Sequence, residues 1–160
     1  MTSRFLARAA IYAALYAALT LAPGLNALAY GPVQFRLSEA LLVFACVDPA
    51  AVVGLTVGTG VGNLASPMMP LDLVLGSALT LVAASVMHVV GPRVVALLAP
   101  VVVNAFGVAA MLAFVLGYPY WASVAWVGFG EAVVLFTAGL ALLFVVRRHR
   151  DLFGIMRPAA

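Results

Sequence analysis

The sequence predicts an all-α integral membrane protein, a bundle of six transmembrane helices with both termini in the cytoplasm. Hydrophobic residues make up 66% of the 160 residues, whereas soluble domains average about 45–50%. Charged residues make up only 8% of the chain, against about 25% in soluble domains. A compact protein of this size must expose much of its surface, and so few charges cannot cover it. These numbers exclude a soluble enzyme, and the single cysteine, Cys46, excludes a disulfide-rich secreted scaffold.

The predicted helices are six apolar stretches separated by short breaks. A spanning helix needs about 20 mostly apolar residues, and lipid offers no hydrogen-bond partner to an open backbone, which favours helix throughout. The predicted segments are residues 4–22, 34–47, 49–65, 71–90, 91–117 and 119–146. The second segment is the shortest, so we expect it to be tilted or partly buried in protein. We expect a single domain over residues 1–160, with a short cytoplasmic tail at about 151–160.

Proline and glycine mark the ends of these segments. Asp48 followed by Pro49 is typical of a helix N-cap with proline at the first helical position. The other breaks fall at Pro23-Gly24, at Pro67 and Pro70, at Gly91-Pro92 and at Gly117-Tyr118-Pro119.

The arginines predict the orientation in the membrane. They lie at the N-terminal end of the first segment, follow the last one and occur once at the fourth connection, as Arg93. By the positive-inside rule these regions lie in the cytoplasm, which requires an even number of spans. Arg36 is the exception, at the outer end of the second segment. The net charge of +3 comes from chain ends and loops and forms no basic stripe, so we expect a lipid bilayer and no nucleic acid as a partner.

Polar side chains in or beside the spans are the candidate binding residues. A charge near the bilayer centre costs about 2.5–3.5 kcal/mol on insertion scales, so such residues usually face a cavity or a partner. In the predicted topology all of them lie in the outer half of the membrane or at its midplane, which indicates a pocket that opens outward. They are Gln34, Arg36, Glu39, Asn63, Asp72, Asn104 and Glu131.

Most of these residues also have a purely structural explanation. Arg36 and Glu39, three residues apart on a helix, could neutralise each other, and Asp72 could cap a helix N-terminus. Asn63 could bond to loop carbonyls, and Asn104 could form an interhelical hydrogen bond. Glu131 is the hardest to explain in this way, because it lies deep in the last segment beside two glycines. Aromatic residues near the outer end fit a membrane-interface belt, of which one or two could stack on a flat ligand.

The first segment carries ridges of small residues. Ala10, Ala14 and Ala18 recur at every fourth position, and so do Ala9, Ala13 and Ala17. This spacing lets another helix approach closely. The ridges could pack within the protein's own bundle, where Gly54 and Gly58 form a similar pair, or dock onto a separate membrane subunit.

Several kinds of chemistry are missing from the sequence. There is no lysine and no GxxxxGK[ST] motif, which excludes ATP binding through a P-loop. One cysteine and two histidines do not form a metal-binding pattern, and there is no GxSxG nucleophile motif. We therefore expect no enzyme activity, no metal and no cofactor bound by this chain. A transporter built from it would take its energy from an ion gradient or from partner proteins.

The segment Tyr30-Gly31-Pro32-Val33-Gln34-Phe35-Arg36-Leu37-Ser38-Glu39-Ala40-Leu41 resembles a signature of the QueT family. Further similarity follows in order over nearly the whole chain, at residues 54–63, Pro70-Leu71-Asp72, Asn104, residues 117–121 and Gly130-Glu131. The Gln34 to Leu41 part is the most specific.

The resemblance implies a substrate-binding S-component of an energy-coupling factor transporter for queuosine precursors, such as 7-cyano- or 7-aminomethyl-7-deazaguanine. It implies six helices with an outward pocket, a membrane coupling subunit and two cytoplasmic ATPases that use the ATP, and docking through small residues of the first helix. In the prokaryotic cell membrane, Ala10, Ala14 and Ala18 would form this interface.

The candidate residues suit a 7-deazaguanine. Its adjacent N–H donors match a carboxylate, either Glu131, which we prefer for its depth, or Glu39. Asn104, Gln34 or Arg36 could donate to the ring carbonyl, and Phe35 or a tyrosine could stack on the ring. A cationic aminomethyl group would favour a second carboxylate, Asp72 or the other glutamate.

The sequence also allows three other functions: an ion-coupled transporter, an intramembrane enzyme and a purely structural membrane protein. The ion-coupled secondary transporter would carry a small polar or aromatic metabolite, with Glu131 as proton carrier. An intramembrane enzyme lacks a recognisable set of catalytic residues, and a purely structural protein does not explain the outward bias of the polar residues.

Overall fold

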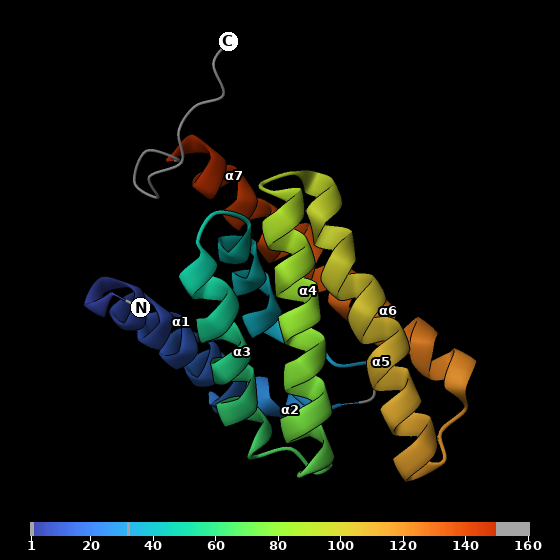
Figure 1. The fold of residues 1–160 in the computed structure, drawn as a ribbon. Helices are drawn as coiled ribbons and strands as arrows, with labels where there is room; N and C mark the ends of the chain where they lie inside the picture. The colour runs from blue at the N-terminus through green and yellow to red at the C-terminus, as the bar shows by residue number, and fades with distance from the viewer. Residues whose placement is uncertain (1, 32, 150–160) are drawn as a thin grey trace.

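The computed structural model describes residues 2–31 and 33–149, and every regular element in these ranges is helical (Figure 1). The predicted tail at 151–160 lies outside the described residues. The α-helices are α1 (Ser3–Leu21), α2 (Leu25–Ala29), α3 (Pro49–Asn63), α4 (Ser77–Val90), α5 (Leu98–Leu116), α6 (Tyr120–Val134) and α7 (Leu140–Arg148). The other regular elements of the described residues are two 3₁₀ helices, η1 (Leu37–Cys46) and η3 (Val94–Leu97), and two π-helical stretches, η2 (Asp72–Gly76) and η4 (Leu135–Gly139).

Within residues 2–31 and 33–149, four helical stretches are long and apolar enough to cross a membrane. They are α1, the continuous η2–α4 helix, the η3–α5 helix and the continuous α6–η4–α7 helix, which has 29 residues. The other two predicted segments correspond to α3, with 15 residues, and η1, with 10, and both are shorter than the roughly 20 residues of a full span. The all-helical fold is thus confirmed, whereas six spans and the cytoplasmic location of the termini stay predictions.

The helix ends follow the local signals in the sequence. The Asp48 side chain accepts a hydrogen bond from the Ala50 backbone N–H at 2.9 Å, so that it caps α3 with Pro49 in the first turn. The α4 and α5 helices end at Gly91 and Gly117, whose φ angles of 76° and 68° favour glycine. The fifth segment starts only at Val94, because the residues around Pro92 form the turn.

The second segment differs from its prediction. It becomes helical only at Leu37, because Gln34 and Arg36 lie in a non-helical stretch that precedes η1. A 3₁₀ helix rises about 2.0 Å per residue, so that ten residues cover about 20 Å, against about 15 Å for an α-helix. As expected for this short segment, η1 is buried in protein, and it packs against α1, α3, α4, α6, η4 and α7.

The α1 and α3 helices pack in close contact. A Cβ atom added at Gly58 would lie 2.7 Å from the Ala13 carbonyl oxygen, and one at Gly54 would overlap the Ala9 carbonyl oxygen. Glycine therefore lets the two backbones approach. This assigns the ridge of Ala9, Ala13 and Ala17 to packing within the bundle. Ala10, Ala14 and Ala18 lie on the other side of α1 and are exposed.

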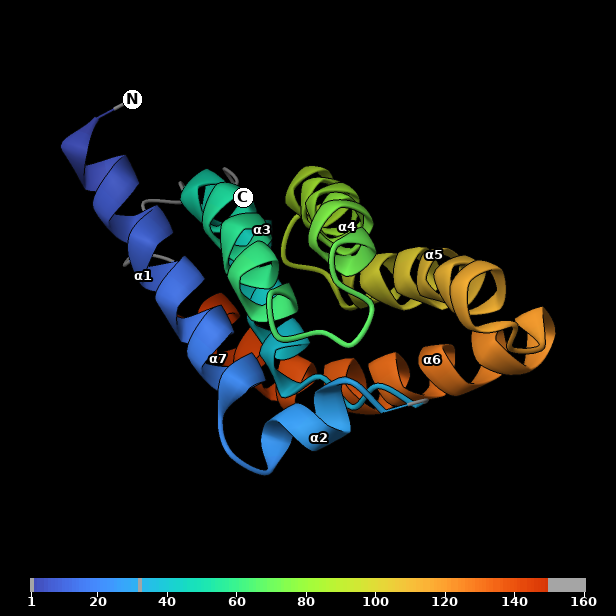
Figure 2. The same cartoon turned by 90° about the horizontal axis from the view of Figure 1, so that it is seen from below.

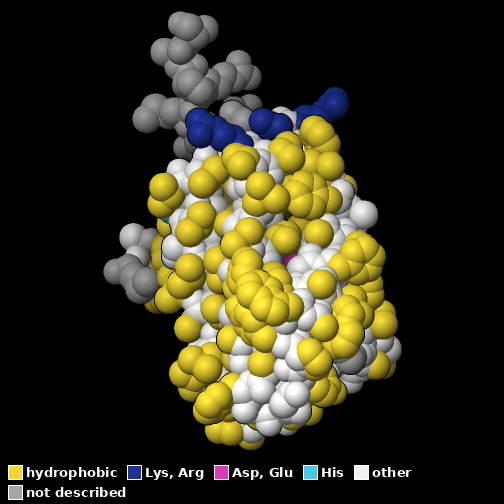
Figure 3. Space-filling view, turned by 90° about the vertical axis from the view of Figure 1, so that its right-hand side faces the viewer, with side chains coloured by type: hydrophobic (Ala, Val, Ile, Leu, Met, Phe, Trp, Pro, Cys, Tyr) yellow, Lys and Arg dark blue, Asp and Glu magenta, His cyan; other side chains and the backbone are white. Residues whose placement is uncertain are grey.

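The molecular surface is apolar over one face, and arginines gather at one of the two ends of the molecule. Figure 3 shows apolar side chains over most of one face, with arginines gathered at one end. Arg147 and Arg148 in the last turn of α7 lie at the same end as the α4–α5 connection, which carries Arg93 (Figure 1). The connections between α1 and α2, α3 and η2, and α5 and α6 lie at the opposite end.

Candidate functional site

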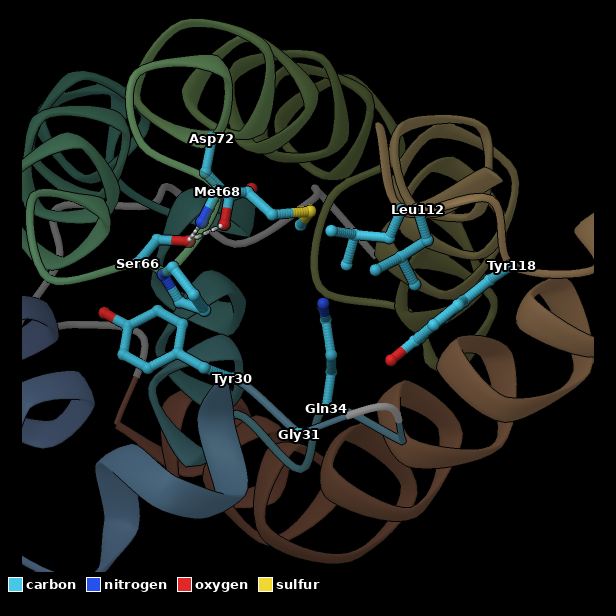
Figure 4. Close-up of a pocket in the computed structure, with 10 residues that line it drawn as sticks. Tyr30, Gly31, Gln34, Ser66, Met68, Asp72, Leu112 and Tyr118 are labelled. Carbon is cyan, nitrogen blue, oxygen red and sulfur yellow. Dashed lines mark hydrogen bonds between the residues drawn. The ribbon is translucent and has the colours of Figure 1, made fainter. Parts of the chain in front are cut away.

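A cavity of about 260 Å³ opens at the end opposite the arginines. Its walls come from four parts of the chain: the end of α2 and the stretch after it, the α3–η2 connection, the second half of α5 and the α5–α6 turn (Figure 4). The lining residues are Tyr30, Gly31, Gln34, Ser66, Pro67, Met68, Asp72, Leu112, Leu116 and Tyr118. Figure 4 shows Gln34 pointing into the middle of this ring of side chains.

Asp72 forms the polar wall of the cavity. Its carboxylate accepts a hydrogen bond from the Ser66 hydroxyl at 2.6 Å, and its backbone carbonyl accepts one from Asn63 Nδ2 at 2.7 Å. The Ser66 hydroxyl in turn accepts a bond from the Met68 backbone N–H. Asn63 therefore satisfies a backbone carbonyl, as its structural explanation predicted, and these bonds hold the α3–η2 connection in place against the cavity.

Residues 33–36, which we call the strap, form a stretch without helical structure that connects the cavity to the interior. Figure 2 shows the connection from α2 to η1 running out along α6 and back. At Gln34 the φ angle is +52°, a conformation that residues other than glycine rarely adopt and that occurs at functional sites. The strap lies directly on α6, since a Cβ atom at Gly130 would overlap the Val33 carbonyl oxygen and lie 3.1 Å from that of Gln34. Glu131 is therefore adjacent to the point where α6 meets the strap.

Beneath the cavity, polar side chains of α1 and η1 meet in the protein interior. The Tyr16 hydroxyl donates a hydrogen bond to Glu39 Oε1, and the Thr20 and Ser38 hydroxyls lie 2.7 Å apart. All four side chains are buried. Arg36 is buried as well, and it interacts electrostatically with Tyr16, Glu39 and Asp72. The structure thus places the guanidinium between the cavity wall and the interior.

The α5 and α6 helices complete this buried group. Asn104 Nδ2 donates a hydrogen bond of 2.8 Å to Glu131 Oε1, and both side chains are buried. The expected interhelical hydrogen bond of Asn104 is therefore present, and it has Glu131 as its acceptor. Glu131 also interacts electrostatically with Glu39 and Arg36. We call Tyr16, Arg36, Glu39, Asn104 and Glu131 the inner cluster.

The inner cluster and the cavity wall hold polar atoms without partners. Across residues 2–31 and 33–149, four buried side-chain polar atoms have no hydrogen-bond partner, and each belongs to a residue singled out from the sequence. A buried polar atom without a partner costs about 1–3 kcal/mol, and each such atom in a native protein requires an explanation. The four atoms are Arg36 Nε, Glu39 Oε2, Asn63 Oδ1 and Glu131 Oε2.

The structure brings most, but not all, of the predicted residues together. Gln34 and Asp72 line the cavity, Asn63 lies behind Asp72, and four others lie in or next to the inner cluster. Phe35 is not among the residues that line the cavity; its ring packs edge-on against Phe129, with centroids 6.1 Å apart. Of the aromatic residues near the outer end, Tyr30 and Tyr118 line the cavity instead.

Two contributing residues were not predicted. Ser66 gives no signal of its own, because a serine directly before a proline is typical of an ordinary loop. Tyr16 lies within the alanine-rich first helix, where the small residues dominate the pattern. The signal that could have found it is its position four residues before Thr20, which places two hydroxyls on one face of the helix.

Together these features define a multi-pass membrane protein with a buried polar cluster beneath a cavity. The sequence profile of the family described as QueT transporter matches residues 6–148, so the chain belongs to the QueT transporter family. This confirms the predicted family and its class, which is a transporter and not an enzyme.

A curated relative supports the same family. The queuosine precursor transporter QueT of Lactococcus lactis subsp. cremoris (strain MG1363) is 42% identical over 73 residues. The matched stretch covers 46% of this chain and 43% of the relative. Comparison with solved structures gives no match.

Proposed function

We propose that this chain is the substrate-binding S-component of an energy-coupling factor transporter in the prokaryotic cell membrane, and that it takes up queuosine precursors. Its cargo would be a 7-deazaguanine base such as 7-cyano- or 7-aminomethyl-7-deazaguanine. A membrane coupling subunit and two cytoplasmic ATPases would supply the energy. The family membership supports the cargo class, and the curated relative carries the matching name.

The observation that carries this proposal is the set of four buried polar atoms without partners. They comprise two carboxylate oxygens, one amide oxygen and one guanidinium N–H. A 7-deazaguanine presents ring and exocyclic N–H donors and one carbonyl acceptor, so that three acceptors and one donor match its edge. The bonds already made by Tyr16 and Asn104 hold the two glutamates in place before the ligand arrives.

The positions of the cavity and of the arginines, at opposite ends of the molecule, support uptake from outside. The cavity opens at the end opposite the arginines, and the positive-inside rule places arginine-rich loops in the cytoplasm. With both termini inside and six spans, the cavity would face the exterior. Ala10, Ala14 and Ala18 are exposed on α1, where they are free to dock against a coupling subunit.

Ligand binding tests the cargo. Protein purified in detergent should show a higher thermal midpoint with either 7-deazaguanine and no shift with adenine, because binding to the folded state stabilises it by mass action. Glu39→Gln keeps the shape of the side chain and removes its charge, and should weaken binding about tenfold or more. Unchanged melting with every 7-deazapurine tested would refute the proposed cargo.

Reconstitution tests the energy source. In liposomes the chain alone should bind the base without accumulating it, and accumulation should require the coupling subunit, the ATPases and ATP. Accumulation by the chain alone, driven by a pH gradient, would instead establish the ion-coupled transporter with Glu131 as proton carrier.

A further inference from the structure

Tyr30 lies at the boundary between the cavity and the inner cluster. Its side chain lines the cavity, and Figure 4 shows its hydroxyl end turned away from Gln34. The Tyr30 hydroxyl donates a hydrogen bond of 2.5 Å to the backbone carbonyl of Gly62 in α3. Because Tyr30 directly follows α2, this bond fixes the end of α2 against α3 and holds the phenol ring in one place.

The ring of Tyr30 supports the buried guanidinium of Arg36. The Arg36 Cζ atom lies over the ring, 5.6 Å from its centroid, which is within the distance of about 6 Å for a cation–π interaction. The backbone of Arg36 is held separately, because its carbonyl accepts a hydrogen bond of 2.9 Å from the Glu39 N–H in the first turn of η1. One contact therefore holds each end of this long side chain.

The contact with the ring leaves a donor of Arg36 free. Four buried side-chain polar atoms in residues 2–31 and 33–149 have no hydrogen-bond partner, and Arg36 Nε is the donor among them, since the other three are oxygens. A cation–π interaction attracts the charge of the guanidinium to the face of the ring, so it can position Arg36 without using the Nε–H group. That group then remains available to an acceptor on a ligand.

We propose that Tyr30 is a positioning residue, whose ring holds the Arg36 guanidinium so that the Nε–H group donates to the ring carbonyl of the bound base. This inference rests on the proposed function and deepens it, because it names the residue that controls recognition of the carbonyl. Tyr118 lines the same cavity from the α5–α6 turn and provides a matched tyrosine for comparison.

Two ligands that differ in one atom test this inference. The first is 7-cyano-7-deazaguanine, and the second is its 6-thio analogue, which keeps the ring N–H groups and replaces the carbonyl oxygen by sulfur, a weak acceptor. In calorimetric titration the wild-type protein should bind the oxo base about tenfold tighter than the thio base. Tyr30→Leu should bring this ratio close to one, whereas Tyr118→Leu should keep it. Because both ligands are measured on the same variant, a loss of folded protein cancels.

Fluorination of the ring provides a second test that preserves the shape of the side chain, for the case that Tyr30→Leu does not fold. Tyr30→Phe keeps the aromatic face and should retain most of the ratio. Fluorinated phenylalanines at the same position withdraw electron density from that face and weaken its attraction for a cation. The ratio should therefore fall with each added fluorine.

The ratio separates positioning from other roles of Tyr30. Equal weakening of both bases by Tyr30→Leu would mean that the ring stacks on the base or only supports the fold, and it would overturn the inference. A ratio near one in the wild-type protein, or a ratio that fluorination does not change, would overturn it as well. In each of these cases the wild-type protein still binds, and the proposed function stands. Failure of the wild-type protein to bind either base would refute the proposed function and this inference with it.

Discussion

At the scale of single residues, the side chains of the inner cluster are held in place by hydrogen bonds and still have polar atoms without a partner. Glu39 and Glu131 each use one carboxylate oxygen to bond a neighbouring side chain and leave the other free. A group held in this way loses little conformational entropy when a ligand binds. The residues that hold the glutamates, Tyr16 and Asn104, are thus expected to affect binding without touching the ligand.

Tyr16→Phe tests this at one position. Removal of the hydroxyl leaves Glu39 without its donor, so we expect about tenfold weaker ligand binding, measured by calorimetric titration. Tyr12→Phe is the control, because Tyr12 lies four residues earlier on α1 and its hydroxyl donates a hydrogen bond to a different carboxylate, that of Asp48. The affinity of the control variant should equal that of the wild-type protein. Equal affinities for Tyr16→Phe and Tyr12→Phe would show that the hydroxyl of Tyr16 has no role in the site.

Gly130 and Gly128 give a second matched pair. A Cβ at Gly130 would overlap the Val33 carbonyl, whereas one at Gly128 would lie 3.3 Å from Ala105 Cβ. Gly130→Ala should therefore displace the strap, lower the stability by about 1–3 kcal/mol and abolish ligand binding. Gly128→Ala should lower the thermal midpoint less and keep binding. Full binding by Gly130→Ala would mean that the strap does not shape the site.

At the scale of elements, α1 serves two surfaces at once. One face packs against α3 and carries Tyr16 and Thr20 to the inner cluster, while Ala10, Ala14 and Ala18 remain exposed on the other. The central η1 helix depends on this contact, because it is enclosed by the surrounding helices. The close approach of α1 and α3 is thus a structural requirement for the site.

Gly58→Ala should weaken this approach. Its Cβ would lie 2.7 Å from the Ala13 carbonyl and 2.8 Å from Tyr16 Cβ, so the helices must separate, at a cost of about 1–3 kcal/mol. A Cβ at Gly60 would lie 3.3 Å from the Ser77 hydroxyl oxygen and 3.7 Å from Leu73 Cδ1, and Gly60→Ala serves as the control. Thermal unfolding in detergent should give a lower midpoint for Gly58→Ala than for Gly60→Ala; the reverse order would contradict this packing.

At the scale of the whole molecule, the exposed alanines should matter only for assembly. Ala14→Leu adds bulk to a surface position on α1, so we expect unchanged ligand binding by the purified chain and a loss of uptake in the reconstituted complex. Ala125→Leu places the same change at an exposed position on α6 and should leave uptake intact. Normal uptake and complex formation with Ala14→Leu would exclude this ridge as the interface.

The orientation of the molecule can be tested by cysteine labelling. The native Cys46 is buried and should react little with a membrane-impermeant maleimide. Ala65→Cys, at the cavity end, should be labelled in intact cells, whereas Arg93→Cys, at the arginine end, should be labelled only after the membrane is permeabilised. Labelling of both from outside would show that the number or direction of the spans differs from the prediction.

The amino-acid sequence by itself determined the helical membrane character, most helix ends and the polar residues worth attention. These features depend on local properties: the length of apolar runs, the φ preference of glycine at Gly91 and Gly117, the Asp48-Pro49 cap, and the cost of polar groups in lipid. The sequence pattern did not reveal the 3₁₀ form of η1, because its burial among the surrounding helices removes the periodicity that distinguishes one helix type from another.

Only the tertiary structure decided which side chains meet. Tyr16 and Glu39 are 23 residues apart, and Asn104 and Glu131 are 27 apart. Their contacts depend on how far each helix is rotated and how closely the backbones approach, as at Gly58 and Gly130. The same rotation separates the alanines of α1 into a ridge that packs against α3 and an exposed ridge. No local pattern encodes that rotation, because it results from the packing of all the helices together.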